Sequence, residues 1–148
     1  MDIYLDSDAA PVKETVTRLA QAHGIKLYMV ASYLTELHSD YATIIHVDPS
    51  KEAADLEIAN RIRPGDVALT ADLGLSALLL ARGAYVLNFR GDAITDANIM
   101  SGLAVRHANK KRRRQGIYAH NPARSADDAY KFEQALDELL SMLQGRTL

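Results

Sequence analysis

Short apolar runs alternate with amphipathic stretches along this chain, and this alternation limits the fold more than any other feature. Runs typical of strands occupy residues 3–5, 26–31, 43–47, 66–70 and 84–87. Stretches typical of helices occupy residues 11–23, 51–62, 75–81, a segment after Thr95-Asp96, and about 126–144. A linker is expected over residues 118–124, and residues 125–128 resemble a capping box with aspartate in place of glutamate. The buried stripe of the last helix is expected to contain Ala129, Phe132, Leu136, Leu139, Leu140 and Leu143. Strands joined by helices require right-handed crossovers. The pattern therefore predicts an α/β fold with three layers, α/β/α, around a mostly parallel sheet.

Length and composition narrow the class of protein further. The chain has 148 residues, 48% hydrophobic and 24% charged, so we expect one globular domain over residues 1–148. It contains no cysteine, which excludes a disulfide framework, a Cys-ligated zinc and a thiol nucleophile. No stretch resembles a secretion signal or is long and apolar enough to cross a bilayer, and a cytoplasmic location is expected.

The first predicted strand ends in a pair of carboxylates, Asp6 and Asp8, shortly before Pro11. Side chains at i and i+2 of a strand project from the same side, so two like charges would lie close together. The carboxyl ends of strands in an open α/β sheet are also where ligands bind. Two interpretations have equal weight at this point: a site for a divalent metal, or a solvated Asp6 with Asp8 capping the helix that begins near Pro11.

Other acidic residues are expected to reach the same end of the sheet. Asp72 follows the strand at 66–70, and Glu52 and Asp55 share one face of the helix that precedes that strand. The alternative for Glu52 and Asp55 is a solvated helix face near a helix N-terminus, and for an unplaced pair it is the better supported one. Asp66 lies at the wrong end of its strand, and Asp92 follows Gly91 in a turn. Both are therefore interpreted as structural.

Carboxylate oxygens without cysteine or a histidine cluster suit Mg²⁺ or Mn²⁺. We therefore expect Asp6, Asp8, Glu52, Asp55 and Asp72 to bind such an ion, with all but Glu52 serving metal-dependent phosphodiester cleavage. A cationic segment over residues 106–114 offers contacts to phosphates of RNA or single-stranded nucleic acid. Its charged residues are Arg106, Lys110, Lys111, Arg112, Arg113 and Arg114. The alternative for this segment is a solubilising surface helix or loop.

Several ordered motifs closely resemble the YaiI/YqxD family of uncharacterised bacterial proteins, which are regarded as PIN-like. They cover nearly the whole chain: residues 6–13, 52–58 and 65–75, Asn88 with Arg90-Gly91, and Arg106-His107. The resemblance implies a PIN-like α/β fold with an acidic centre. It also implies that Asp6, Asp8, Asp55 and Asp72 are the matching acidic positions.

The chain departs from the pattern of that family at several positions. The family start usually reads Asp-Ala-Asp-Ala-Cys-Pro, so Ser7 and Ala10 differ, and Ala10 removes a thiol. Glu52 stands where the family often has aspartate, and Phe89 stands where proline is common. None of these differences removes an expected metal ligand.

Three functions are compatible with these residues. The first is a metal-dependent nuclease acting on RNA or another single-stranded nucleic acid. The second is a non-catalytic module that binds nucleic acid or a partner. The third is an aspartyl-phosphate phosphatase with Asp6 as nucleophile and Asp8 as acid and base. It is weaker because Ala10 stands where threonine or valine is expected, and no matching lysine motif is evident.

Overall fold

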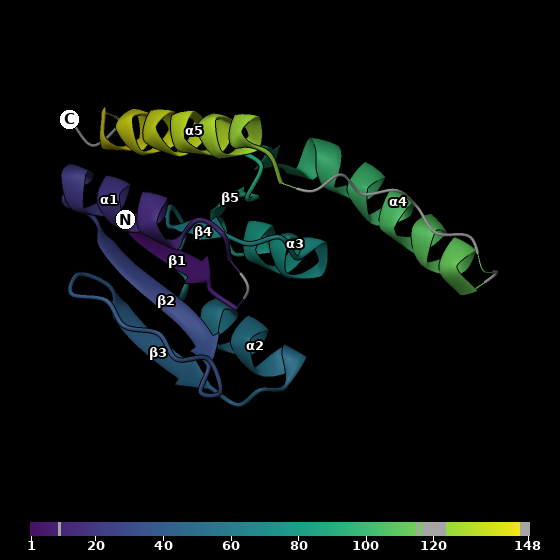
Figure 1. Ribbon diagram of the computed structural model, residues 1–148. Coiled ribbons are helices and arrows are strands. Elements are labelled where there is room, and N and C mark those ends of the chain that lie inside the picture. Colours follow the sequence, from purple (N-terminus) through teal and green to yellow (C-terminus); the bar gives the residue numbers. More distant parts are fainter. Residues whose placement is uncertain (9, 115, 117–123, 146–148) are drawn as a thin grey trace.

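The computed structural model contains one six-stranded sheet with helices on both faces (Figure 1). It describes residues 1–148 except 9, 115, 117–123 and 146–148, and it leaves undescribed the side chains of Lys51, Arg106 and Arg113. The strand order is β3-β2-β1-β4-β5-β6. Every neighbouring pair is parallel except β5 and β6, which pair antiparallel. The predicted α/β fold with three layers and a mostly parallel sheet is confirmed.

The elements follow the predicted alternation closely. The strands are β1 (Asp2–Asp6), β2 (Lys26–Ser32), β3 (Thr43–Val47), β4 (Val67–Leu69), β5 (Tyr85–Leu87) and β6 (Ala93–Ile94). The helices are α1 (Lys13–His23), α2 (Lys51–Arg61), α3 (Leu73–Ala81), α4 (Asp96–Arg114) and α5 (Ala126–Gly145). Within the described residues, none of these helices combines the length and apolar composition needed to cross a bilayer.

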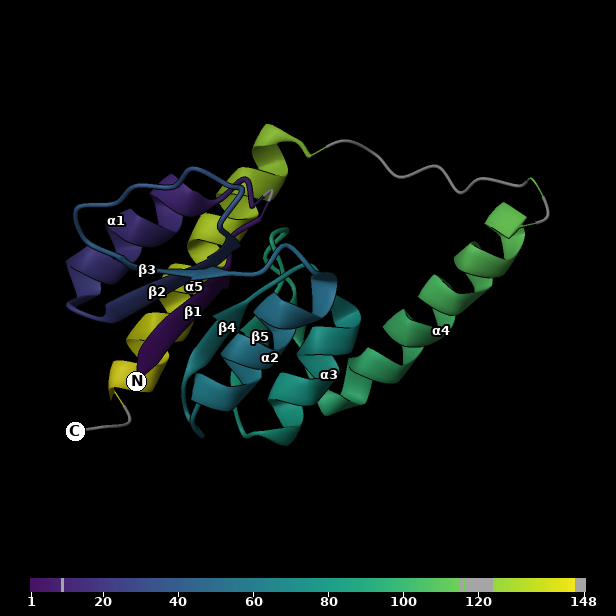
Figure 2. The same ribbon diagram turned by 90° about the horizontal axis from the view of Figure 1, so that it is seen from below.

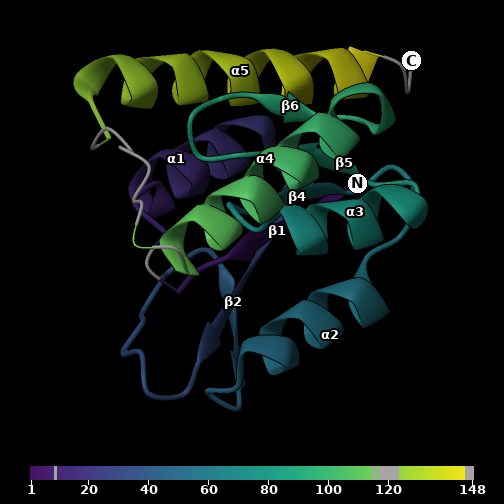
Figure 3. The same cartoon turned by 90° about the vertical axis from the view of Figure 1, so that its right-hand side faces the viewer.

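The sheet separates two hydrophobic cores, because side chains alternate between its faces. Ile3 and Leu5 of β1 face the core that contains residues of α1 and α5, whereas Tyr4 faces the core that contains residues of α2 and α3. Figures 2 and 3 show α1 and α5 on one face of the sheet and α2 and α3 on the other. Asp6 follows Tyr4 in the same alternation, which places its side chain on the α2 and α3 face.

Some details of the elements differ from the sequence predictions. The two-residue strand β6 is absent from those predictions, since it is too short to show a periodic pattern. Ala129, expected in the buried stripe of α5, is exposed, and the stripe is formed by Phe132, Leu136, Leu140 and Leu143. The cationic segment is the C-terminal half of the continuous helix α4. A linker expected over residues 118–124 lies outside the described residues apart from Arg124.

Polar contacts fix both ends of α5 against the rest of the fold. At its start, the Ser125 amide donates to Asp128 Oδ2 (3.0 Å), and the Asp128 amide donates to Ser125 Oγ (3.1 Å), which is the predicted capping box with aspartate in place of glutamate. Near its end, Gln144 Nε2 donates to the carbonyl oxygen of His23, the last residue of α1 (2.8 Å).

The His23 ring lies between two hydrogen-bond acceptors on α5. Its Nδ1 is 2.8 Å from Gln144 Oε1, and its Nε2 is 2.7 Å from Asp137 Oδ1. Because Gln144 Nε2 donates to the His23 carbonyl oxygen, the amide atom that faces the ring is the acceptor Oε1. Both ring nitrogens must therefore donate, so these contacts select the imidazolium form. The hydrogen bonds to Asp137 and Gln144 raise the pKa of His23 above its usual value.

We expect the stability of the fold to fall as pH rises through the raised pKa of His23. The contribution of the imidazolium is fully present below the ordinary pKa of 6.5 and is lost once the folded-state ring deprotonates. Melting temperatures measured between about pH 6 and 9 should fall by a few degrees in the wild type and less in His23→Gln. His38→Gln, at an exposed histidine, is the control and should behave as the wild type. Equal pH dependence in all three proteins would contradict this role of His23.

Candidate functional site

An acidic cleft opens at the carboxyl ends of β1 and β4, where the chain order of the sheet reverses. It has a volume of about 390 Å³ and is lined by Asp6, Asp8, Ala71, Asp72, Leu73 and Phe89. Connections leave β1 and β4 toward helices on opposite faces of the sheet, which leaves a crevice between them. Three of the predicted acidic residues therefore line one cleft.

Asp6 ends β1 and is half-buried in this cleft. Its Oδ2 accepts a hydrogen bond from the Thr70 hydroxyl just past the end of β4 (2.9 Å). Burial raises the pKa of Asp6, and repulsion from Asp55, Asp8 and Asp72 raises it further, against the opposing effect of the Thr70 bond. The four carboxylates carried over by the family resemblance thus form one electrostatically coupled group.

Asp8 lies beyond the end of β1, so the alternation of strand side chains no longer governs its direction. The Ser32 amide at the end of β2 lies 3.2 Å from both Asp8 carboxylate oxygens, and Thr35 Oγ1 donates to Oδ1 (2.9 Å). The interpretation of Asp8 as a helix cap is wrong, because α1 begins at Lys13 and its N-cap position, Val12, has no side-chain cap. Asp6 is therefore bonded toward β4 and Asp8 toward β2.

Asp72 has a structural role that sequence reasoning missed. It is the N-cap of α3, where its Oδ1 accepts from the Leu75 amide (3.0 Å). The Asp72 amide in turn donates to Thr70 Oγ1 (3.1 Å), the same hydroxyl that donates to Asp6. Thr70 links the two aspartates. The signal for this cap was an aspartate three residues before Leu75, at the start of an apolar run.

The two acidic residues of α2 are placed differently. Asp55 is half-buried and lies near enough to act on the charge of Asp6, as expected. Glu52 is exposed in the first turn of α2 and is not among the described residues that line the cleft. Asp66 is buried at the opposite end of β4, where it accepts from the amides of Asp2 and Arg63 (2.9 Å each).

The donor set and its spacing give different indications about a metal ion. Asp6, Asp8, Asp55 and Asp72 supply hard oxygen donors and mutual repulsion that a divalent cation would relieve. In the described part of the chain, however, no three Asp, Glu, His or Cys side chains are gathered closely enough to hold an ion. The Asp8 carboxylate already accepts hydrogen bonds from Ser32 and Thr35, and the Asp72 carboxylate accepts one from Leu75. A metal ion would compete with these donors.

The cationic segment extends away from the sheet. Figures 1 and 2 show α4 projecting beyond the other helices. From Ala104 to Arg114 the described side chains are exposed, apart from the half-buried Asn109. His107, Lys110, Lys111 and Arg114 follow one another at helical spacing and line a shallow hollow of about 320 Å³. One stripe of this helix therefore presents several cations to solvent.

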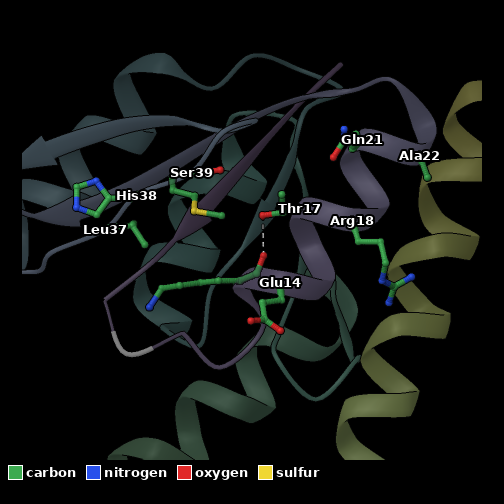
Figure 4. A pocket seen from close by; sticks show the side chains of 10 residues that line it. Glu14, Thr17, Arg18, Gln21, Ala22, Leu37, His38 and Ser39 are labelled. Carbon is green, nitrogen blue, oxygen red and sulfur yellow. Dashed lines mark hydrogen bonds between the residues drawn. The ribbon is translucent and has the colours of Figure 1, made fainter.

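A larger hollow lies elsewhere, between α1 and the segment at 37–39 (Figure 4). Its volume is about 620 Å³, and its charged lining residues are Lys13, Glu14, Arg18 and His38. Arg18 forms an ion pair with Glu133 of α5. His38 Nε2 lies 3.4 Å from Glu36 Oε1. The acidic cleft is smaller but contains carboxylates coupled at strand ends. On chemical grounds we therefore take the cleft as the candidate site.

Comparisons with known proteins agree with the resemblance in the motifs. The chain matches the model of the uncharacterised YaiI/YqxD family over residues 4–142. It is 37% identical over 150 residues to a UPF0178 protein of Alkaliphilus oremlandii, covering 98% of this chain and 97% of that protein. It is 40% identical over 146 residues to a UPF0178 protein of Bacillus velezensis, covering 97% and 87%. No solved structure matches the chain. By the family model and by identity over nearly its full length, the chain belongs to the YaiI/YqxD family.

Proposed function

We propose that this protein is a metal-dependent phosphodiesterase acting on RNA or another single-stranded nucleic acid. The observation that carries the proposal is the convergence of Asp6, Asp8 and Asp72 on one cleft, where burial and repulsion from nearby carboxylates also raise the pKa of Asp6. Such a group of carboxylates at a sheet switch point is costly to maintain without a cation, and Mg²⁺ or Mn²⁺ is the cation that suits its oxygen donors. The PIN-like character of the family, implied by the resemblance, is consistent with this activity.

The residues have distinct parts in this proposal. Asp6, Asp8 and Asp72 would hold the ion at the cleft, and Asp55 would add to the negative potential from α2. A bound divalent ion supplies a polarised phosphate and a more acidic water. The Thr70 hydroxyl orients Asp6 by donating a hydrogen bond to its carboxylate. The same hydroxyl accepts a hydrogen bond from the Asp72 amide and so positions the Asp72 backbone. Thr35 and Ser32 hold Asp8 at the opposite side of the cleft.

The exposed half of α4 supplies the complementary charge. Lys110, Lys111 and Arg114 lie on one stripe and are available to phosphates of a flexible strand. Such contacts would hold the substrate without reading its sequence. Arg106 and Arg113 lie in the same helix and stay predicted contacts, since their side chains are outside the described part of the structure.

One observation favours the second candidate, a non-catalytic module that binds nucleic acid. Among the described residues no set of three ligands is gathered for a metal, whereas the cations of α4 are already exposed. In that case the acidic cleft would contribute to the architecture alone. Metal binding and metal-dependent cleavage distinguish the two candidates.

Divalent ions should raise the melting temperature of the wild type. An ion that binds only the folded state stabilises it by mass action, by about 2.7 kcal/mol at a hundredfold excess over the dissociation constant. We expect a rise of a few degrees with millimolar Mn²⁺, and its loss in the double variant Asp6→Asn, Asp72→Asn. Asparagine also caps helices, so α3 should be retained.

The matched control for the metal response is Asp40→Asn, Asp127→Asn, which removes the same charge at exposed positions. This control should respond to Mn²⁺ as the wild type does. Calorimetry without detectable binding at millimolar Mn²⁺ would overturn the metal site.

Cleavage should depend on the same carboxylates. In single-turnover assays with Mn²⁺ and a mixed pool of single-stranded RNA, Asp8→Asn and Asp72→Asn should cut about a hundredfold more slowly than the wild type. RNA affinity should be unchanged or slightly higher, because a negative charge near the phosphates is removed. Equal residual cleavage in all three preparations would indicate a contaminating nuclease and would leave the non-catalytic module as the function.

Replacing Lys110, Lys111 and Arg114 with alanine should weaken RNA binding to a similar degree for all sequences. The slope of log affinity against log salt should decrease by about 0.7 for each phosphate that the helix no longer neutralises. Alanine favours helix, so α4 should remain folded. Arg82→Ala, which removes an exposed cation after α3, is the control and should leave the slope unchanged. An unchanged slope in the triple variant would return this segment to a solubilising surface.

A further inference from the structure

A second, smaller pocket adjoins the acidic cleft and is cationic. It has a volume of about 310 Å³ and is lined by Pro11, Ala71, Asn88, Phe89, Arg90 and Arg124. Ala71 and Phe89 also line the acidic cleft, so the two hollows share a wall. The residues come from four separate places: the turn before α1, the segment after β4, the turn after β5, and Arg124 shortly before α5.

The two arginines of this pocket lie close to the same carboxylate. The hydrogen bond from the Ser125 amide lowers the pKa of Asp128, and the charges of Arg90 and Arg124 lower it further. Arg90 Nη1 is 3.9 Å from Asp128 Oδ2. That oxygen also accepts from the Ser125 amide in the capping box. Nearby, Asp92 pairs with Lys131, whose Nζ lies 2.5 Å from Asp92 Oδ1. Among the described residues at this place, Arg90, Arg124 and Lys131 therefore lie near the two carboxylates of Asp92 and Asp128.

The turn that carries Arg90 is tightly fixed. Asn88 Oδ1 accepts from the amides of Arg90 (3.0 Å) and Asp92 (2.9 Å). Gly91 has a φ of 85°, and a Cβ there would lie 2.8 Å from the Lys131 carbonyl carbon of α5, so only glycine fits. Arg124 also donates through Nη1 to the carbonyl oxygen of Phe89. The turn that carries Arg90 is therefore preorganised, and the Arg124 side chain is bonded to it.

We propose that this pocket binds a phosphate group of the strand being cleaved, next to the bond that lies over the acidic cleft. Guanidinium groups match the geometry and charge of phosphate. A carboxylate cleft alone repels a polyanion, so an adjoining cationic pocket is needed to bring a backbone phosphate up to it. Phe89 forms the wall between them and offers an apolar face to the intervening nucleotide. This inference rests on the proposed function for the identity of the strand.

In the binding test the protein is titrated with inorganic phosphate in the absence of metal ions, and the affinity is measured by NMR or calorimetry. Affinity should fall about tenfold in Arg90→Gln and in Arg124→Gln, because each variant lacks one charge-assisted hydrogen bond to phosphate. Arg82→Gln, which removes an exposed cation after α3 that lines neither hollow, is the matched control and should bind as the wild type does. Arg90 is half-exposed, so its variant should fold even if loss of the Arg124 bond to Phe89 destabilises the other. Equal affinity in Arg90→Gln and wild type would overturn the pocket.

A kinetic test separates this inference from the proposed function. With RNA and Mn²⁺, Arg90→Gln should raise KM several-fold and change kcat little, whereas Arg82→Gln should change neither. If RNA is cleaved and KM is unaltered in Arg90→Gln, the pocket is not a substrate subsite although the proposed function stands. If the wild type does not cleave but phosphate binding still depends on Arg90, the catalytic proposal fails and the anion site stands.

Discussion

The parallel pairing of β1 with both β2 and β4 is the constraint on which the rest of this structure depends. Tyr4 is in register with Tyr28 on one side and Ala68 on the other, and Ile3 and Leu5 are fully buried. Because β1 has a neighbour on each edge, its carboxyl end is flanked by two other strand ends. The chain leaves β1 toward α1 on one face and β4 toward α3 on the other. The cleft between these connections follows from the pairing alone.

The acidic cleft shows how a fold holds several carboxylates close together at strand ends. Each of its three lining aspartates accepts a hydrogen bond from a neighbouring strand or helix end: Asp6 from Thr70, Asp8 from Thr35, and Asp72 from the Leu75 amide. Such bonds favour the charged form locally, but burial and repulsion still raise the pKa of Asp6. Hydrogen bonds to neutral donors orient carboxylates without removing their net charge. The cleft is thus rigid and electrostatically strained at once.

Local patterns in the sequence are sufficient for the helices and for every strand except β6, whereas the polar partners of the site are not predictable from them. The strand at 43–47, the Ser125 and Asp128 capping box and the convergence of Asp6 with Asp72 follow from periodicity, cap chemistry and strand order. Thr70 and Thr35 could not be identified, because a hydroxyl takes its role from a neighbour distant in sequence. The pocket at Arg90 and Arg124 joins two turns that only the packing of α5 brings together. The prediction for Ala129 is wrong because helical spacing alone does not fix the edge of a buried stripe.

The two halves of α4 differ in what keeps them helical. Ile99 and Leu103 join the core beneath α3, and Gly102 allows close approach, since a Cβ there would lie 3.2 Å from Leu73 Cδ1. Beyond Ala104 the described side chains are exposed apart from the half-buried Asn109. Intrinsic propensity favours the helix there, and repulsion among neighbouring cations opposes it. A polyanion that neutralises those charges removes the repulsion. In this half of α4, binding of a polyanion would therefore favour the helix. The helical fraction of the segment would also depend on the salt concentration around it.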